Sequence, residues 1–256
     1  MKNSVIYEQP LNERTRSFMR LEFLFRQADH TLRGTTVWDR RSSIASLLEI
    51  HNLVNRSDMK TELLKELERH TGNLSKLEQN PGVDKNRLSK ILNGLNDLSG
   101  KIYNTDKPFG HELKNNEFLN SIRQRATVPG GTCDFDLPGY HFWLQSSNEK
   151  QTNEMKTWLA SFSLLRKAVE LLLSLIRESS NPEHETAKEG FYQRNLDSSS
   201  PCQLLRIYLP KEARYFPEIS GGKHRFTIRF LCLEDYEIKP KQAEEDVEFE
   251  IACCMI

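Results

Sequence analysis

The spacing of apolar residues changes near residue 180, and this change constrains the fold more than any other feature of the chain. Before it, apolar residues recur at steps of three and four, as in a helix with one buried face; the first such series is Phe18, Leu21, Phe25, Ala28 and Leu32. After a breaker at residues 179–182, they come in short β-favouring runs separated by turn residues. The sequence therefore predicts an α+β protein, with a helical bundle followed by a mostly antiparallel β domain.

The same periods predict individual elements and two domains. Helices are expected over residues 18–32, 44–54, 63–77, 88–102 and 118–122, and the longest over residues 148–179. Ser57 or Asp58 is expected to cap the third helix and Asp84 the fourth. Strands are expected over residues 4–8, 191–193, 204–209, 224–233 and 247–251, with a turn at residues 220–223. We expect a helical domain over residues 11–180, and a β domain over residues 187–256 that recruits residues 1–10.

A short segment in the middle of the chain combines a sharp turn with many aromatic residues. Val128-Pro129-Gly130-Gly131 cannot continue a helix, because proline lacks an amide hydrogen and the glycines permit positive φ. The residues that follow are short, aromatic and partly alternating in polarity. We therefore expect residues 128–145 to form an extended junction segment.

Composition excludes several classes of protein. The first thirty residues carry charges throughout and contain no apolar core of a secretory signal, so a cytoplasmic protein is expected. The most apolar window, residues 159–176, is interrupted by Arg166, Lys167 and Glu170, which indicates an amphipathic helix rather than a membrane anchor. The cysteines are odd in number and show no C-x-x-C spacing, which favours reduced, structural thiols over disulfides or zinc; they are Cys133, Cys202, Cys232, Cys253 and Cys254.

The net charge of zero conceals a segregation along the chain. Residues 11–41 contain seven arginines and four acidic residues, and residues 201–229 contain six basic and two acidic residues. Residues 234–250 contain eight acidic residues and two lysines. Most of these charges are expected to be solvated surface residues. The basic regions can also converge into a patch for an anionic partner, with the acidic segment elsewhere.

No motif of catalysis, metal binding or cofactor binding is present. The stretch Gly221-Gly222-Lys223-His224 fails the phosphate-loop pattern twice, at Pro217 and at His224. Histidines show no paired ligand spacing, and no serine lies in a G-x-S-x-G elbow. Asp134 and Asp136 suit an acid/base pair, but also capping or pairing with arginine, and the structural roles are favoured. We predict that the protein is not an enzyme, and that it binds no metal and no cofactor.

Several strings of this chain together resemble the ZapD family of bacterial cell division proteins. They are PLNERTR at residues 10–16, TELLKELERH at residues 61–70, PGVDKNRL at residues 81–88, RQRATVPGGTCDFDLPGYHFWLQ at residues 123–145 and PEISGGKHRFTIRF at residues 217–230. Their number, order and spacing carry the resemblance, which covers nearly the whole chain. It implies a dimeric, non-enzymatic adaptor at mid-cell that binds the C-terminal tail of FtsZ, crosslinks FtsZ filaments into bundles and so promotes Z-ring assembly.

The resemblance also implies which residues bind the tail. The candidates are Arg20, Arg56, Arg123, His141, Arg225 and Arg229. Arg225 and Arg229 lie four apart in a predicted strand and so face the same side. Tyr140, Phe142 and Trp143 are expected either to line an aromatic groove near these residues or to pack in the core. Two alternatives stay open: a nucleic-acid-binding module that uses the same basic and aromatic patch, and an enzyme that uses Asp134, Asp136 and His141. We expect neither nucleic acid nor a membrane among the partners.

Overall fold

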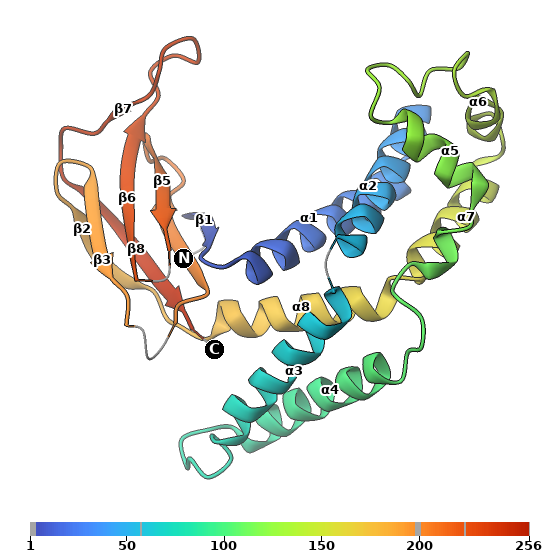
Figure 1. The fold of residues 1–256 in the computed structure, drawn as a ribbon. Helices are drawn as coiled ribbons and strands as arrows, with labels where there is room; N and C mark the ends of the chain where they lie inside the picture. Colours follow the sequence, from blue (N-terminus) through green and yellow to red (C-terminus); the bar gives the residue numbers. More distant parts are fainter. Residues whose placement is uncertain (1–3, 57, 198–200, 223, 256) are drawn as a thin grey trace. The chain divides into compact units, whose positions relative to one another are not determined.

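The computed structural model describes residues 4–56, 58–197, 201–222 and 224–255 (Figure 1). The chain divides into two compact units. The helical unit is Ser17–Leu172, and the β unit combines Met1–Arg16 with Leu173–Ile256. The predicted α+β class is confirmed. No described helix is both long enough and apolar enough to cross a bilayer.

Eight α-helices and one 3-10 helix account for the helical structure of the described residues. They are α1 (Glu13–Arg33), α2 (Val37–Asn55), α3 (Met59–Ser75), α4 (Lys85–Tyr103), η1 (His111–Leu113), α5 (Glu117–Arg125), α6 (Pro138–Leu144), α7 (Asn148–Ala160) and α8 (Ser163–Glu178). The caps explain where several of them begin. Asp84 accepts hydrogen bonds from the amides of Asn86 and Arg87 at the start of α4, and Asp58 accepts one from Thr61 at the start of α3. Both predicted caps are confirmed, while Ser57 lies outside the described residues.

Two predictions about helices are wrong. The helix expected over residues 148–179 is two helices, because α7 ends at Ala160 and α8 begins at Ser163. The Ser161 hydroxyl bonds back to the carbonyl of Trp158 (2.7 Å), a local bond that competes with helix continuation. Residues 138–144, expected to be extended, form α6. Pro138 is accepted in its first turn, where no amide hydrogen is needed.

The turn predicted before α6 is confirmed. Gly130 has a φ of 70°, the left-handed region that glycine occupies without strain. The amide of Gly131 donates to the carbonyl of Val128 at 2.9 Å. The chain therefore reverses direction directly after α5, where the prolyl-glycyl sequence predicted it.

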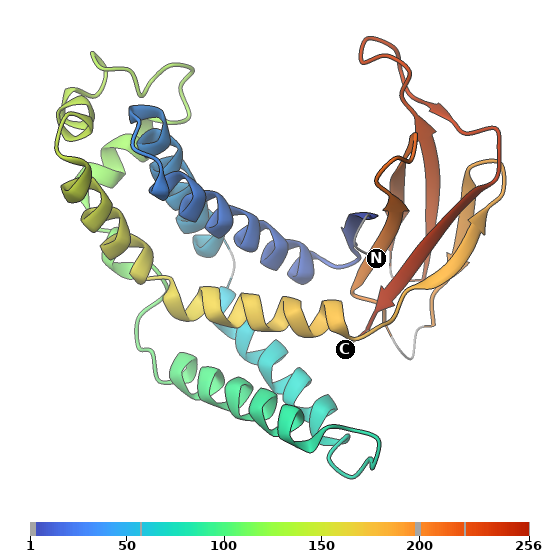
Figure 2. The ribbon, with the colours of Figure 1, turned by 180° about the vertical axis from the view of Figure 1, so that it is seen from behind.

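Helices α3 and α4 pack side by side, as both views show (Figures 1 and 2). His70 of α3 is fully buried, with Nε2 3.6 Å from Glu66 Oε2. Its Nδ1 has no hydrogen-bond partner in the described part of the chain. Burial lowers the pKa of His70 and outweighs the hydrogen bond with Glu66, which acts in the opposite direction. The imidazole is therefore held neutral inside the helical unit.

This buried histidine should make the helical unit sensitive to acid. Below about pH 6.5 the unfolded state takes up a proton that the folded state resists, so stability falls as pH decreases, by at most about 1.4 kcal/mol per pH unit for one histidine. His70→Gln should weaken this pH dependence, whereas His30→Gln, at an exposed position of α1, should not. The measurement is the urea midpoint at about pH 7.5 and about pH 5.5. If the urea midpoint changed by the same amount between the two pH values in wild type and in His70→Gln, His70 would not be the source of the acid sensitivity.

The β unit is a two-layer sandwich, seen from opposite sides in Figures 1 and 2. Its strands are β1 (Ser4–Pro10), β2 (Glu183–Ala187), β3 (Phe191–Asn195), β4 (Leu204–Pro210), β5 (Tyr215–Gly221), β6 (Arg225–Cys232), β7 (Lys241–Gln242) and β8 (Val247–Cys254). Sheet A has the order β1-β4-β8-β2, and sheet B has the order β3-β6-β5, with β7 paired to β6. All pairings are antiparallel. The N-terminal strand therefore joins β4, as the sequence predicted.

The core of the sandwich lies between alternate residues of the two sheets. Phe226, Ile228 and Phe230 of sheet B pack in one cluster with the inward residues of β4 and β8. Three strands, β2, β5 and β7, were not predicted from the sequence. The segment of β2 is polar, and β5 contains Pro217, which argues against a strand unless that strand lies at an edge. Both are edge strands, so the period of two is weak in β2 and the missing amide is harmless in β5.

Candidate functional site

Three aromatic side chains of the helical unit are exposed to solvent around one network of polar contacts. Trp38, Phe135 and Phe142 are 77%, 86% and 77% exposed. Exposed aromatic residues that gather in one part of a surface can mark a protein interface, where aromatic side chains are frequent anchors. Together with the polar residues that connect them they form the junction cluster: Trp38, Arg41, Asp134, Phe135, His141 and Phe142.

Arg41 and Asp134 hold the junction cluster together. Arg41 Nη2 lies 3.0 Å from Asp134 Oδ1, and Nη1 donates to the carbonyl of Thr132 at 2.7 Å. The guanidinium carbon lies 5.7 Å from the ring centroid of Trp38 and 5.1 Å from that of Tyr140. One arginine thus connects the start of α2 to the loop before α6.

His141 meets the same carboxylate from α6. Its Nδ1 lies 3.0 Å from Asp134 Oδ1, the atom that Arg41 also contacts. Phe135 and Phe142 are chain neighbours of Asp134 and His141, so this contact places their backbones close together. Burial raises the pKa of Tyr140 to about 12, which keeps its hydroxyl neutral beside Arg41.

Local sequence explains why Trp38 and Arg41 share a face. Thr36 and Asp39 form a reciprocal capping box that fixes the start of α2. Trp38 and Arg41 are then three residues apart on one side of the helix. Arg40, which lies between them in the sequence, points away from this side and is buried. This spacing was available in the sequence, so the two residues could have been found as neighbours on one face of the helix.

Of the two alternatives expected for these aromatic residues, core packing holds for Trp143 and Tyr140. Four rings pack together with centroid separations of 5.6 to 6.1 Å; they are Phe118, Tyr140, Trp143 and Trp158. Trp143 and Tyr140 are buried, and the Trp143 indole donates a hydrogen bond to Glu154. Phe142 alone of the three predicted aromatic residues faces solvent, because α6 turns its neighbours inward.

Two other predicted residues of the helical unit, Arg123 and Arg56, lie away from the junction cluster, near the C-terminal end of α2. Arg123 is half-buried, donating to Asn120 Oδ1 at 2.8 Å, and its Nη1 lies 3.3 Å from His51 Nδ1. Burial, and then the charge of Arg123, lower the pKa of His51. Arg56 is exposed at the C-terminal end of α2, one turn beyond His51. Since Arg41 and His51 are ten residues apart on α2, this place lies about 15 Å along the helix from the junction cluster.

Arg20 is exposed on α1, and among the described residues neither Arg20 nor Arg56 makes an ion pair. Both guanidinium groups are therefore available to a partner. Arg123, by contrast, already uses its donors inside the unit.

Arg225 and Arg229 project together from the outer face of sheet B, as predicted. Both are exposed, while Phe226 and Ile228 between them are buried. Arg229 forms an ion pair with Glu218, its cross-strand neighbour on β5. Phe191, opposite Arg229 on β3, is 42% exposed. This face therefore presents basic and apolar groups side by side.

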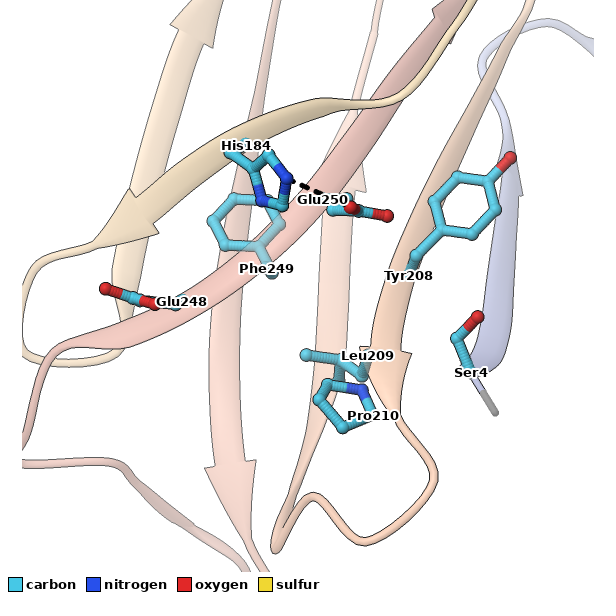
Figure 3. Close-up of a pocket in the computed structure, with 8 residues that line it drawn as sticks. All are labelled: Ser4, His184, Tyr208, Leu209, Pro210, Glu248, Phe249 and Glu250. Carbon is cyan, nitrogen blue, oxygen red and sulfur yellow. Dashed lines mark ion pairs between the residues drawn. The ribbon is translucent and has the colours of Figure 1, made fainter. Parts of the chain in front are cut away.

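The opposite face of the sandwich has the opposite charge. A pocket of about 350 Å³ on the outer face of sheet A is lined by Ser4, His184, Tyr208, Leu209, Pro210, Glu248, Phe249 and Glu250 (Figure 3). Glu248 and Glu250 alternate with buried residues of β8, and His184 Nε2 lies 3.2 Å from Glu250 Oε1. An acidic pocket does not suit an anionic ligand. In the described residues, no group of three or more His, Cys, Asp and Glu side chains is arranged to hold a metal ion.

Comparisons with known proteins point to one family. A family model described as "ZapD: Cell division protein" matches residues 19–229. The chain is 47% identical over 256 residues to the cell division protein ZapD of Methylococcus capsulatus, with both proteins covered completely. It is 38% identical over 254 residues to the cell division protein ZapD of Coxiella burnetii, covering 99% of this chain and 98% of that protein. The cell division protein ZapD of Aromatoleum aromaticum is 35% identical over 252 residues, covering 98% of each. The similarity extends through both units.

Proposed function

Because the chain belongs to the ZapD family of cell division proteins, we propose that it binds the C-terminal tail of FtsZ and, as a homodimer, crosslinks and bundles FtsZ filaments to promote Z-ring assembly at mid-cell. A role in cell division follows from the family itself. The protein acts by binding and not by catalysis. Two weak tail sites on one dimer become a strong lateral link along a polymer, since the second binding event is intramolecular.

The junction cluster is the observation that carries this proposal. Trp38, Phe135 and Phe142 are exposed around a polar network that fixes the backbone beneath two of them. Aromatic anchors on a rigid support lose little conformational entropy on binding and are typical hot spots. A short extended peptide with apolar and acidic residues matches such a surface.

Basic residues supply the charge that an acidic tail needs. Arg20, Arg56 and Arg225 are exposed and make no ion pair among the described residues, so each can pair with a tail carboxylate. Arg229 would release its ion pair with Glu218 and pair with a carboxylate of the tail instead. Arg123 and His141 act by orienting their neighbours, because their nitrogens already contact Asn120 and Asp134.

Co-sedimentation with FtsZ polymerised in GTP tests the proposal. Wild-type protein should pellet with full-length FtsZ and not with tail-deleted FtsZ. Trp38→Ala combined with Phe142→Ala should weaken binding about tenfold or more, as expected for the loss of a hot spot. Tyr103→Ala, which removes an equally exposed aromatic ring from α4, should bind like wild type. Arg225→Glu combined with Arg229→Glu should also lose binding, while Lys239→Glu combined with Lys241→Glu should not.

Three results would contradict the proposal. Undiminished binding to tail-deleted FtsZ would remove the tail as the ligand. A monomer in sedimentation velocity at micromolar concentration would remove crosslinking. Binding to single-stranded DNA that competes with FtsZ, and that the Trp38 and Phe142 substitutions abolish, would favour the nucleic-acid alternative, because exposed rings beside arginine can also stack bases.

A further inference from the structure

Two of the five cysteines, all of which are free thiols, converge at one end of the β sandwich. Cys202 is buried in the core cluster, and Cys253 packs against that cluster from the inward face of β8. The amide of Gln203 donates to the carbonyl of Cys254 at 2.8 Å, so the chain that carries Cys202 runs along the end of β8. The Cys202 thiol donates to the carbonyl of Leu204 at 3.5 Å, and the two thiols also interact with each other.

An arginine lies beside the more accessible of these two thiols. Arg194 Nη1 is 3.8 Å from Cys253 Sγ. The guanidinium is held in place by Tyr192 Oη, 2.8 Å from Nε, and by Glu183 and Glu185 of β2. A nearby positive charge and a thiol donor both stabilise a thiolate. Accordingly, the hydrogen bond with Cys202 lowers the pKa of Cys253, with Arg194 acting in the same direction against burial and Glu183.

The pKa values of the neighbouring cysteines, Cys202 and Cys254, are raised instead of lowered. Burial raises the pKa of Cys254, which is on the outward side of β8, to about 11. The same hydrogen bond that favours the Cys253 thiolate raises the pKa of Cys202, together with burial. Cys253 is therefore suited to attack an oxidant as a thiolate. Cys202 stays protonated and is suited to provide the second sulfur of a disulfide, together with the proton that the leaving oxygen needs.

We propose that Cys202 and Cys253 are an oxidation-sensitive thiol pair that a hydroperoxide, such as hydrogen peroxide, converts into an intramolecular disulfide. The Cys253 thiolate attacks one peroxide oxygen, the O–O bond breaks, and hydroxide leaves, giving a sulfenic acid on Cys253. Cys202 sulfur then attacks the Cys253 sulfur and expels the oxygen, which leaves as water with the proton of Cys202. In total, two thiols and one hydrogen peroxide give one disulfide and two waters, and a thiol reductant reverses the change.

The disulfide would link the segment before β4 to the end of β8. It would close a loop that contains β4, β5, β6 and β7, and so restrict the unfolded state of the β unit. The urea midpoint of the oxidised protein should therefore be higher than that of the reduced protein. This site is separate from the junction cluster and does not depend on binding to FtsZ.

Peptide mapping of the purified full chain tests the proposal directly. After brief treatment with a small excess of hydrogen peroxide and alkylation of the remaining thiols, the intact protein should lose two hydrogens and two alkylation sites. Proteolysis without reductant should yield a peptide that links Cys202 to Cys253. Cys232→Ser, at a half-buried cysteine on β6, should give the same link.

Single substitutions then separate the roles. Cys202→Ser should accumulate a sulfenic acid on Cys253 that dimedone traps, and Cys253→Ser should leave Cys202 reduced. A disulfide with another partner, an intermolecular disulfide, or equal dimedone trapping of wild type and Cys202→Ser would overturn the proposal. Because the wild-type map needs no variant, a folding defect in either serine variant does not affect the conclusion.

Discussion

Replacing Arg40 with methionine is expected to destabilise the helical unit by about 3 kcal/mol, a large fraction of the 5 to 15 kcal/mol typical of a domain. Arg40 is 2% exposed, and each of its three guanidinium nitrogens donates a hydrogen bond inside the unit. Nε donates to Gln151 Oε1, Nη1 to the carbonyl of Leu32, and Nη2 to Thr152 Oγ1, each at 3.0 Å. One side chain therefore joins the end of α1, the start of α2 and the start of α7.

The loss should also reach the junction cluster. Gln151, which Arg40 contacts, donates to the carbonyls of Trp143, Leu144 and Ser146 at 3.0 to 3.1 Å and so holds the end of α6. Arg40→Met removes the charged donor from Gln151 Oε1, the carbonyl of Leu32 and Thr152 Oγ1. Each hydrogen bond to a charged donor is worth about 1.5 to 3 kcal/mol, before the relief of no longer burying a charge is subtracted. The FtsZ binding proposed above should fall together with stability.

Urea unfolding followed by tryptophan fluorescence measures this change. All three tryptophans belong to the helical unit, so the signal reports that unit alone. Arg20→Met, at an exposed position of α1, is the matched control and should change stability by less than about 0.5 kcal/mol. Arg40→Lys should lose nearly as much as Arg40→Met, since an ammonium cannot reproduce the three directions of the guanidinium. Equal midpoints for Arg40→Met and Arg20→Met would show that the network contributes nothing.

The second large effect is expected from Glu8→Gln in the β unit, also about 3 kcal/mol. The Glu8 carboxylate accepts from Arg177 and Arg206 at 2.9 Å, and the three side chains are only 17% to 18% exposed. Arg206 also lies over the Tyr208 ring, 5.3 Å from its centroid. Glu8→Gln removes a negative charge that pairs with two partly buried arginines, so desolvation and repulsion both act against folding.

Hydrogen exchange of the β1 and β4 amides should detect the change, because Glu8 lies on β1 and pairs with Arg206 of β4. Glu218→Gln removes an exposed ion pair of the same unit and should cost less than about 1 kcal/mol. Adding Arg206→Met to Glu8→Gln should restore part of the loss, since it removes one of the uncompensated charges. A double variant less stable than the sum of the single changes would contradict this explanation.

Much of the fold could be predicted because its signals are local. The period of three and four identified α1 to α5, and short alternating runs identified β1, β3, β4, β6 and β8. Asp84 and the turn at Gly130 were found from residue chemistry alone. The strands that were missed are edge strands, where a polar sequence or a proline is tolerated. The helix α6 was missed because a seven-residue aromatic run fits both periods.

The candidate site was predictable only in part. The segment at residues 128–145, singled out from the sequence, supplies four of the six residues of the junction cluster, and Arg225 and Arg229 share an outer face as predicted. Residue types alone did not show which side chains of this segment are buried and which are exposed. Trp143 is buried in the core, and His141 contacts the carboxylate of Asp134, which also pairs with Arg41.

By itself, the sequence determined the α+β class, the recruitment of the first strand and, through the order of its strings, the ZapD family. Only the tertiary structure decided which of two adjacent residues of similar type is buried and which contacts each of them makes. Arg40 is buried and Arg41 joins the junction cluster, Trp143 is buried and Phe142 is exposed, and Cys253 packs against the core of the sandwich while Cys254 is buried on the other side of β8. Local periodicity shows which residues share a face of an element, but which face is covered depends on packing against elements far along the chain.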